Sequence, residues 1–68
     1  MAVINTIDLT GVSADGWREA ANEALREASR TIRHITRCDV VRCSAVVEDG
    51  VITEYHTELR LFFDVETR

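Results

Sequence analysis

The chain has 68 residues and can form one small domain, which buries only about 60% of the surface that its unfolded chain exposes. Its formal net charge of −4 argues against a nucleic-acid partner, because such binders carry a clustered basic surface. No apolar run approaches the ~20 residues of a membrane span, and no signal-peptide pattern opens the sequence, so we expect a cytoplasmic protein without a membrane partner.

A core this small is usually supported by disulfides, a metal ion or subunit contacts. Cys38 and Cys43 lie five residues apart in one strand-like run, an extended span of roughly 16 Å that a disulfide cannot bridge. The two side chains are also expected to point to opposite faces of the sheet. No Cys or His pairs occur at zinc-finger spacing. The sequence therefore predicts self-association into a homo-oligomer.

The first predicted strand covers residues 3–10. Val3, Ile7 and Leu9 fall on one side of this strand and polar residues on the other, which is the period of a half-buried strand. Gly11 is expected to end the strand by supplying backbone freedom. Ser13 is expected to cap the following helix with its hydroxyl.

A long helix is predicted over residues 14–35. Its apolar positions recur every three or four residues and are mostly alanines, which lets the helix axis lie close against a flat sheet. The opposite face is charged and is interpreted as solvent-exposed. Trp17 is expected to pack into the core or a subunit contact. His34 is expected to cap the last carbonyls of the helix.

Residues 37–47 and 51–65 are typical of two strands joined by a turn at Asp49-Gly50. A two-residue loop would place odd-numbered residues opposite even-numbered ones and split the apolar faces, so a three-residue or bulged turn is expected instead. The pairs of opposite residues would then be Val41 with Leu59, Ala45 with Tyr55, and Arg42 with Glu58.

This order of elements predicts an α+β fold over residues 1–68, with a β-α-β-β arrangement and a three-stranded antiparallel sheet packed on one long helix. A single helix of ~20 residues cannot cover both faces of such a sheet. We expect the uncovered face to contact other subunits, because it mixes apolar and charged residues as interfaces do. These residues are Val40, Val46, Ile52 and Phe62 among Arg42, His56, Glu58 and Arg60.

Four segments of the chain resemble the dodecin family: residues 9–13, residues 32–35, Asp39-Val40-Val41 and Glu48-Asp49-Gly50. The resemblance runs through essentially the whole chain, as a single dodecin-like domain. It implies a hollow spherical homododecamer that binds flavin (FMN, FAD or riboflavin) and, in some bacterial members, coenzyme A. It also implies storage of the ligand without turnover.

The sequence departs from the flavin-binding members of the family at their ligand site. Those members carry a Trp at the start of the second strand, where pairs of Trp sandwich the isoalloxazine ring, and Arg37 occupies that position here. His56 matches a third-strand Gln that hydrogen-bonds the ring edge, and Ser44 with Ala45 matches an Arg-Gly pair. The resemblance thus implies weakened flavin binding, with cofactor-binding residues at Arg37, His56, Ser44 and Cys38.

An alternative without flavin also follows from the resemblance, because some dodecin-like proteins that lack the Trp are associated with calcium. Residues 37–39 look closer to that branch. Carboxylates on the outer strand face could supply hard oxygen ligands near a symmetry axis, although no EF-hand spacing is present. The alternative is therefore a shell that binds calcium or other ions, or a purely structural oligomer. The carboxylates in question are Glu54, Glu58 and Asp64.

Catalysis is not expected from this sequence. Cys43 and His56 are the only candidates for a nucleophile and a base, and the predicted register places them on opposite faces of the sheet. Cys43 is expected to be a small core residue, since free cysteines are among the most buried residue types. No catalytic residue is assigned, and the protein is predicted not to be an enzyme.

Overall fold

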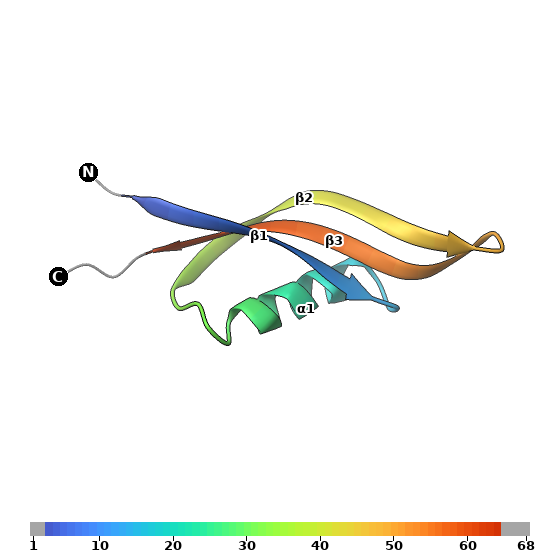
Figure 1. The fold of residues 1–68 in the computed structure, drawn as a ribbon, viewed down its shortest axis with the longest axis horizontal. Coiled ribbons are helices and arrows are strands. Elements are labelled where there is room, and N and C mark those ends of the chain that lie inside the picture. The colour runs from blue at the N-terminus through green and yellow to red at the C-terminus, as the bar shows by residue number, and fades with distance from the viewer. Residues whose placement is uncertain (1–2, 65–68) are drawn as a thin grey trace.

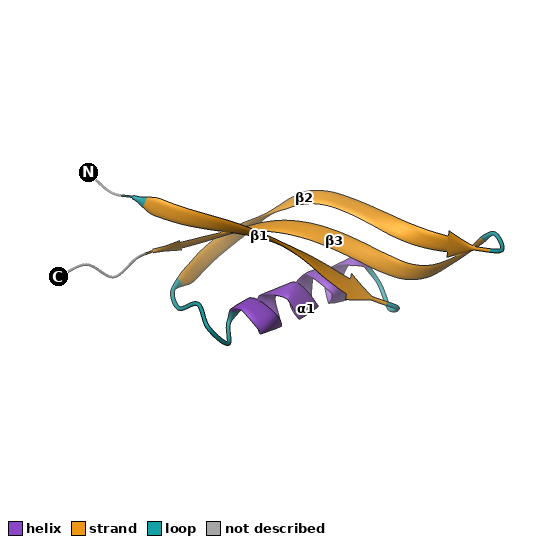
Figure 2. Cartoon of the chain, in the orientation of Figure 1, coloured by secondary structure: helices purple, strands orange, loops and turns teal. Residues whose placement is uncertain are grey.

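The structure, a computed structural model, describes residues 3–64. Strand β1 (Ile4–Ser13) is followed by helix α1 (Trp17–Ala28), and two long strands, β2 (Ile35–Glu48) and β3 (Val51–Asp64), come after it. The predicted β-α-β-β order is confirmed, and the helix lies on one face of a three-stranded antiparallel sheet (Figures 1 and 2). Val65, the predicted last residue of the third strand, lies outside the described residues.

The central strand of the sheet is β3, which pairs with β1 on one side and with β2 on the other. Its side chains alternate, and Thr57, Leu59 and Leu61 are at most 1% exposed because they lie under the helix. The side chains between them lie on the opposite face, which we call the open face because α1 does not cover it. The open face carries Arg37, Ser44 and His56.

The helix packs closely on the sheet through the predicted row of alanines. Ala20, Ala24 and Ala28 are each at most 5% exposed and follow one another at four-residue intervals along one side of α1. A Cβ added to Gly11 would overlap the backbone carbonyl of Ala20. Gly11 is therefore required by this close approach, whereas the sequence had suggested that it ends the strand. The strand continues through Gly11 to Ser13.

The helix is shorter than predicted at both ends. Ser13 does not cap it, because Ser13 pairs with Tyr55 as the last residue of β1 and its hydroxyl accepts a hydrogen bond from the Asp15 backbone N–H (3.0 Å). The helix ends at Ala28 although the apolar spacing continues. Ile32 and Ile35 do pack against the core, but they do so from a loop and from β2.

His34 also has a different place from the predicted helix cap. It lies after the helix has ended, with a positive φ of 63°, directly before β2. Its backbone carbonyl accepts a hydrogen bond from the Asp64 N–H at 3.3 Å. His34 therefore belongs to the connection that brings the chain back into the sheet.

The turn between β2 and β3 contains two residues, contrary to expectation. Asp49 and Gly50 have φ values of 52° and 78°, and positive values at both central positions are what a type I′ turn requires. The bulge that restores the odd-with-odd register lies beyond the turn, between the pair at Val46 and the pair at Val47, where Thr53 has no partner across the ladder.

The predicted pairs are correct at two positions out of three. Ala45 lies opposite Tyr55 and Arg42 lies opposite Glu58, as expected. Leu59, however, lies opposite Val40, because a second irregularity in β2 leaves Val41 without a partner. The sequence could not predict this bulge, because Val40 and Val41 are identical residues and either of them could face the helix.

The subunit is long and flat. Its extents are 55 × 21 × 12 Å and its radius of gyration is 14.1 Å, whereas a compact 68-residue domain has a radius of about 11 Å. The length comes from the end of the β2–β3 hairpin, residues 46–54, which continues past the last β1 pair at Tyr55 and which we call the arm (Figure 1). The arm exposes four aliphatic side chains, Val46, Val47, Val51 and Ile52.

Candidate ligand-binding site

Arg37 lies near one end of the open face, opposite Phe62 of β3. Its guanidinium carbon lies 3.9 Å from the centroid of the Phe62 ring, which is the geometry of a cation–π contact. The Arg37 Nε atom also approaches the Asp39 carboxylate at 4.0 Å. The cation is thus positioned over an aromatic ring of its own chain.

An ion-pair network continues across the open face from Asp39. Arg60 lies opposite Asp39 and opposite Asp8, and it donates hydrogen bonds to both carboxylate oxygens of Asp8, at 2.9 and 3.3 Å. These hydrogen bonds hold the pKa of Asp8 below its ordinary value of 3.8, and they raise the pKa of Arg60. Both side chains are about half exposed, so the ion pair contributes little to the stability of the fold. Its main effect is to fix the positions of the two side chains on the open face.

His56 and Ser44 lie opposite each other on the same open face, closer to the arm. The His56 Nε2 atom is 3.0 Å from Oε1 of Glu54, and the imidazole is about one-third exposed, with 32% of its side chain accessible. This ring can exchange one hydrogen bond with a ligand while Glu54 orients the ring.

Three of the four predicted site residues therefore share a face, but they do not converge within one chain. Arg37 lies level with Phe62, six residues along β3 from His56, which corresponds to roughly 20 Å at ~3.3 Å per residue. A small ligand cannot contact both residues of one chain. A pocket that uses both positions needs residues from a second subunit.

Cys38, the fourth predicted residue, lies on the other face of the sheet. It pairs with Leu61 and packs against the core under the helix. Cys43 pairs with Thr57 on that same face, so the two thiols do not point to opposite faces as predicted, because the bulge at Val41 reverses the alternation between them. Cys43 is exposed in the single chain, and both cysteines are free.

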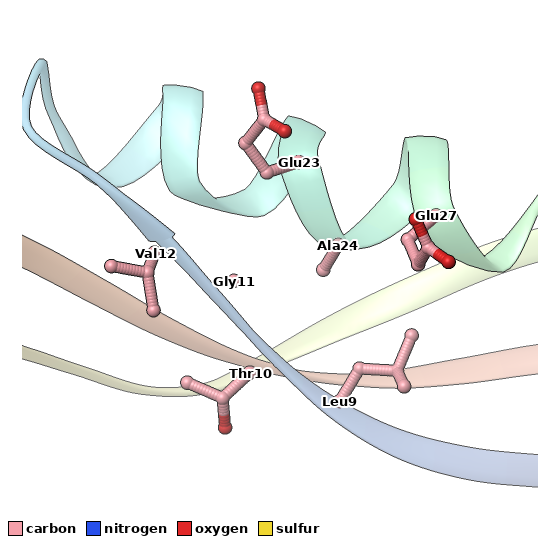
Figure 3. A pocket seen from close by; sticks show the side chains of 7 residues that line it. All are labelled: Leu9, Thr10, Gly11, Val12, Glu23, Ala24 and Glu27. Atoms are coloured by element: carbon pink, nitrogen blue, oxygen red, sulfur yellow. The ribbon is translucent and has the colours of Figure 1, made fainter.

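A shallow groove of about 330 Å³ lies on the helix side of the molecule, between the end of β1 and α1. Figure 3 shows Glu23 and Glu27 on the helix beside the strand. Both carboxylates already accept hydrogen bonds, Glu23 from Arg26 of the same helix and Glu27 from Arg30 in the turn after it. The groove contains none of the predicted site residues, and it is lined by Leu9, Thr10, Gly11, Val12, Glu23, Ala24 and Glu27.

Trp17 joins the helix to the two long strands through a ring contact and two hydrogen bonds. Its indole N–H donates to the Ser44 carbonyl oxygen at 3.0 Å, and its ring meets the Tyr55 ring edge-on with centroids 4.8 Å apart. The Thr57 hydroxyl donates to the Trp17 carbonyl oxygen at 2.8 Å. The sequence indicated packing for Trp17 but contained no signal for its partner, because Ser44 is 27 residues away.

Within residues 3–64, no group of three or more His, Cys, Asp or Glu side chains could hold a metal ion. The carboxylates proposed for calcium thus do not gather within the described part of one subunit. No helix in this part of the chain is both long and apolar enough to span a membrane.

Comparison with known proteins gives one consistent result. A family model described as Dodecin matches residues 3–66. The dodecin of Streptomyces coelicolor is 27% identical, with 98% of this chain and 96% of that chain covered and a TM-score of 0.91. A tryptophan-to-phenylalanine mutant of Thermus thermophilus dodecin is also 27% identical, with 98% and 100% covered and a TM-score of 0.92.

The dodecin of Streptomyces davaonensis, at 21% identity, has the same fold, with a TM-score of 0.90 over 97% of both chains. No curated protein matches the sequence significantly.

Proposed function

The chain belongs to the dodecin family, and on this premise we propose that it forms a closed homo-oligomer, a dodecamer, that binds and stores a small planar ligand of the flavin type without turnover. Residues 1–68 form the single domain of each subunit in this proposal. The expected flavin affinity is weak, because Arg37 stands where the resemblance implies a stacking tryptophan. We also propose a cytoplasmic location, which the two free cysteines favour.

The observation that carries the proposal is the open face. It carries an aromatic ring and ion pairs that the helix leaves uncovered, and its Arg37 and His56 positions are too far apart in one chain to hold one small ligand. The radius of gyration of 14.1 Å and the exposed arm further support assembly, since an isolated chain of this shape leaves much apolar surface in water. Ligand sites of such a subunit would lie between copies of the chain.

The absence of turnover in this proposal rests on the placement of the reactive side chains as well as on the family. Cys43 pairs with Thr57 on the helix side, and His56 pairs with Ser44 on the open face. The two side chains therefore project from opposite faces and cannot form a nucleophile–base pair within one subunit.

Flavin titration tests the ligand part of the proposal. We expect the protein to quench the fluorescence of added riboflavin weakly, and Arg37→Trp to bind more tightly by about fivefold or more, because an aromatic ring contact contributes roughly 1 kcal/mol. His56→Gln should add to this gain. The double variant should gain more than the sum only if the two positions meet at one ligand from different subunits.

Light scattering after size-exclusion chromatography tests the assembly part. We expect a mass close to twelve subunits, whereas a species near the 7.7 kDa of one chain at micromolar concentration would contradict it. If the double variant keeps its oligomer but quenches no flavin, storage of a flavin-type ligand is the wrong function for this chain.

A further inference from the structure

We propose that the Arg37 site selects a planar aromatic ligand that carries a negative charge, such as an aromatic carboxylate. This inference rests on the proposed function and specifies its ligand class. It comes from three features of Arg37 in the structure: a stacked guanidinium, terminal nitrogens without a hydrogen bond among the described residues, and an exposed position on the open face.

The contact with Phe62 fixes the position of the Arg37 guanidinium on the open face. The guanidinium carbon lies over the Phe62 ring, 3.9 Å from its centroid, so the ring covers one side of the cation. The other face is available, because the Arg37 side chain is 62% exposed. A guanidinium is weakly hydrated and stacks on aromatic rings through its face, so a second ring can lie on the available side.

The hydrogen-bonding groups of Arg37 are also largely uncommitted. Within residues 3–64, its one ion pair is the long contact of 4.0 Å between Nε and the Asp39 carboxylate. Arg60 directs its own donors to Asp8, through two hydrogen bonds, and lies opposite Asp39. The two terminal nitrogens of Arg37 are therefore the donors on this part of the face that an incoming carboxylate can engage, and their fork geometry matches a carboxylate.

A neutral ring would use only part of this arrangement. It could stack on the guanidinium, but it would leave the terminal N–H groups to water and gain nothing from the charge. A ring with a carboxylate at its edge engages the guanidinium face and the donors together. The site is thus expected to prefer anionic aromatic ligands over neutral aromatic ligands of the same shape, and over anionic ligands without a ring.

The test uses three small probes on the intact oligomer, by equilibrium dialysis. The first two, 2-naphthoate and 2-naphthamide, have the same ring and nearly the same shape but differ in charge. The third, cyclohexanecarboxylate, keeps the charge and lacks the flat ring. We expect 2-naphthoate to bind at least about fivefold more tightly than either of the other two. Raising the salt concentration should reduce this preference, because the added attraction is electrostatic.

Variants then assign the preference to Arg37. Arg37→Gln should bring the naphthoate-to-naphthamide ratio close to one, and Arg37→Lys should weaken both naphthalenes while keeping the preference for the anion. Arg42→Gln is the matched control, because Arg42 lies on the same strand and face, opposite Glu58, and its removal changes the charge by the same amount. This control should retain the full preference of the parent protein.

The outcomes separate this inference from the proposed function. Equal binding of 2-naphthoate and 2-naphthamide overturns the inference, whereas the proposed function, binding of a planar ligand, would still stand. Equal loss of preference in Arg37→Gln and Arg42→Gln overturns it as well, since a general surface charge would then explain the result. If the protein binds neither the two naphthalene probes nor riboflavin, the proposed function and the inference are both wrong.

Discussion

Gly11 and the backbone carbonyl of Ala20 lie so close together that no side chain at position 11 can fit between strand β1 and helix α1. Ala20 itself is fully buried, and Ala24 and Ala28 continue the contact along the helix. The distance between helix and sheet is therefore set by the smallest residues of both elements.

Replacing Gly11 by alanine should destabilise the protein. The added methyl group meets backbone atoms, which cannot move aside without shifting the helix, so we expect a loss of about 2 kcal/mol or more in the free energy of unfolding. Chemical denaturation at fixed protein concentration measures the change. Gly16→Ala is the control, since its Cβ would meet only the flexible end of Glu19, and it should lose roughly 1 kcal/mol at most. Equal losses in the two variants would show that the contact at Gly11 can relax.

Trp17→Phe tests the link between the helix and strand β2. The substitution keeps an aromatic ring next to Tyr55 but removes the indole N–H that donates to Ser44. We expect the free energy of unfolding to fall by about 1 kcal/mol, the usual net contribution of one hydrogen bond. Far-UV circular dichroism follows the transition without relying on Trp fluorescence. An Arg18→Ala control changes the neighbouring exposed residue, and a Trp17→Phe variant no less stable than this control would contradict the prediction.

The Asp8–Arg60 pair predicts a defined pH dependence. The pKa of Asp8 is lower in the folded protein than its ordinary value of 3.8, so the unfolded chain takes up a proton first as the pH falls. The pair therefore contributes stability above that pH, and the contribution disappears as the pH falls through the lower folded pKa. Asp8→Asn should melt at a lower temperature than the parent at neutral pH. The gap should close below pH ~3.8.

Melting temperatures from neutral to strongly acidic pH at low salt provide the measurement for Asp8→Asn. Asp15→Asn is a suitable control, because the Asp15 carboxylate is exposed and makes no ion pair within residues 3–64, so its variant should follow the parent curve. A gap between Asp8→Asn and the parent that widens as the pH falls would have the wrong sign for this explanation.

Val51→Asp tests whether the arm lies in a subunit contact. Val51 is 62% exposed in the single chain, so the substitution should be tolerated by the fold. A charge without a partner is costly in a buried interface, and we expect light scattering to show a smaller species than for the parent. Asn22→Asp adds the same charge to an exposed helix position and should keep the parent mass. An unchanged mass for Val51→Asp would place the arm outside the assembly contacts.

The order of elements and the alanine contact could be predicted, because both follow from the spacing of apolar residues along the chain. Leu59 and Leu61 alternate with polar residues, and Ala20, Ala24 and Ala28 recur at helical spacing. The end of the helix could not be predicted in the same way. Ile32 is at helical spacing from Ala28 and packs on the same core, but it does so from a loop. Spacing alone does not distinguish these two routes to the same contact.

The candidate site was predictable only in part. Ser44 and His56 share the open face, but plain alternation from Ser44 would place Arg37 on the opposite face. The bulge at Val41 brings Arg37 to the open face, and this bulge depends on three-dimensional packing that two adjacent valines do not reveal. Cys38 was also assigned to the site, but it is next to Arg37 on the strand, and neighbours along a strand point to opposite faces. The contact between Arg37 and Phe62 depends on residues 25 positions apart, and only the register of the sheet brings them together.

The position of β3 between the other two strands bears on how the chain acquires its fold during synthesis. Ile4 pairs with Asp64, so the first strand leaves the ribosome long before its only partner in the sheet exists. The hairpin can close early through its two-residue turn, whereas β1 and α1 lack Leu59 and Leu61 to pack against until translation is nearly finished. The fold is therefore completed in a late step, and nascent chains that stall before residue 59 would expose their apolar strand and helix surfaces to chaperones.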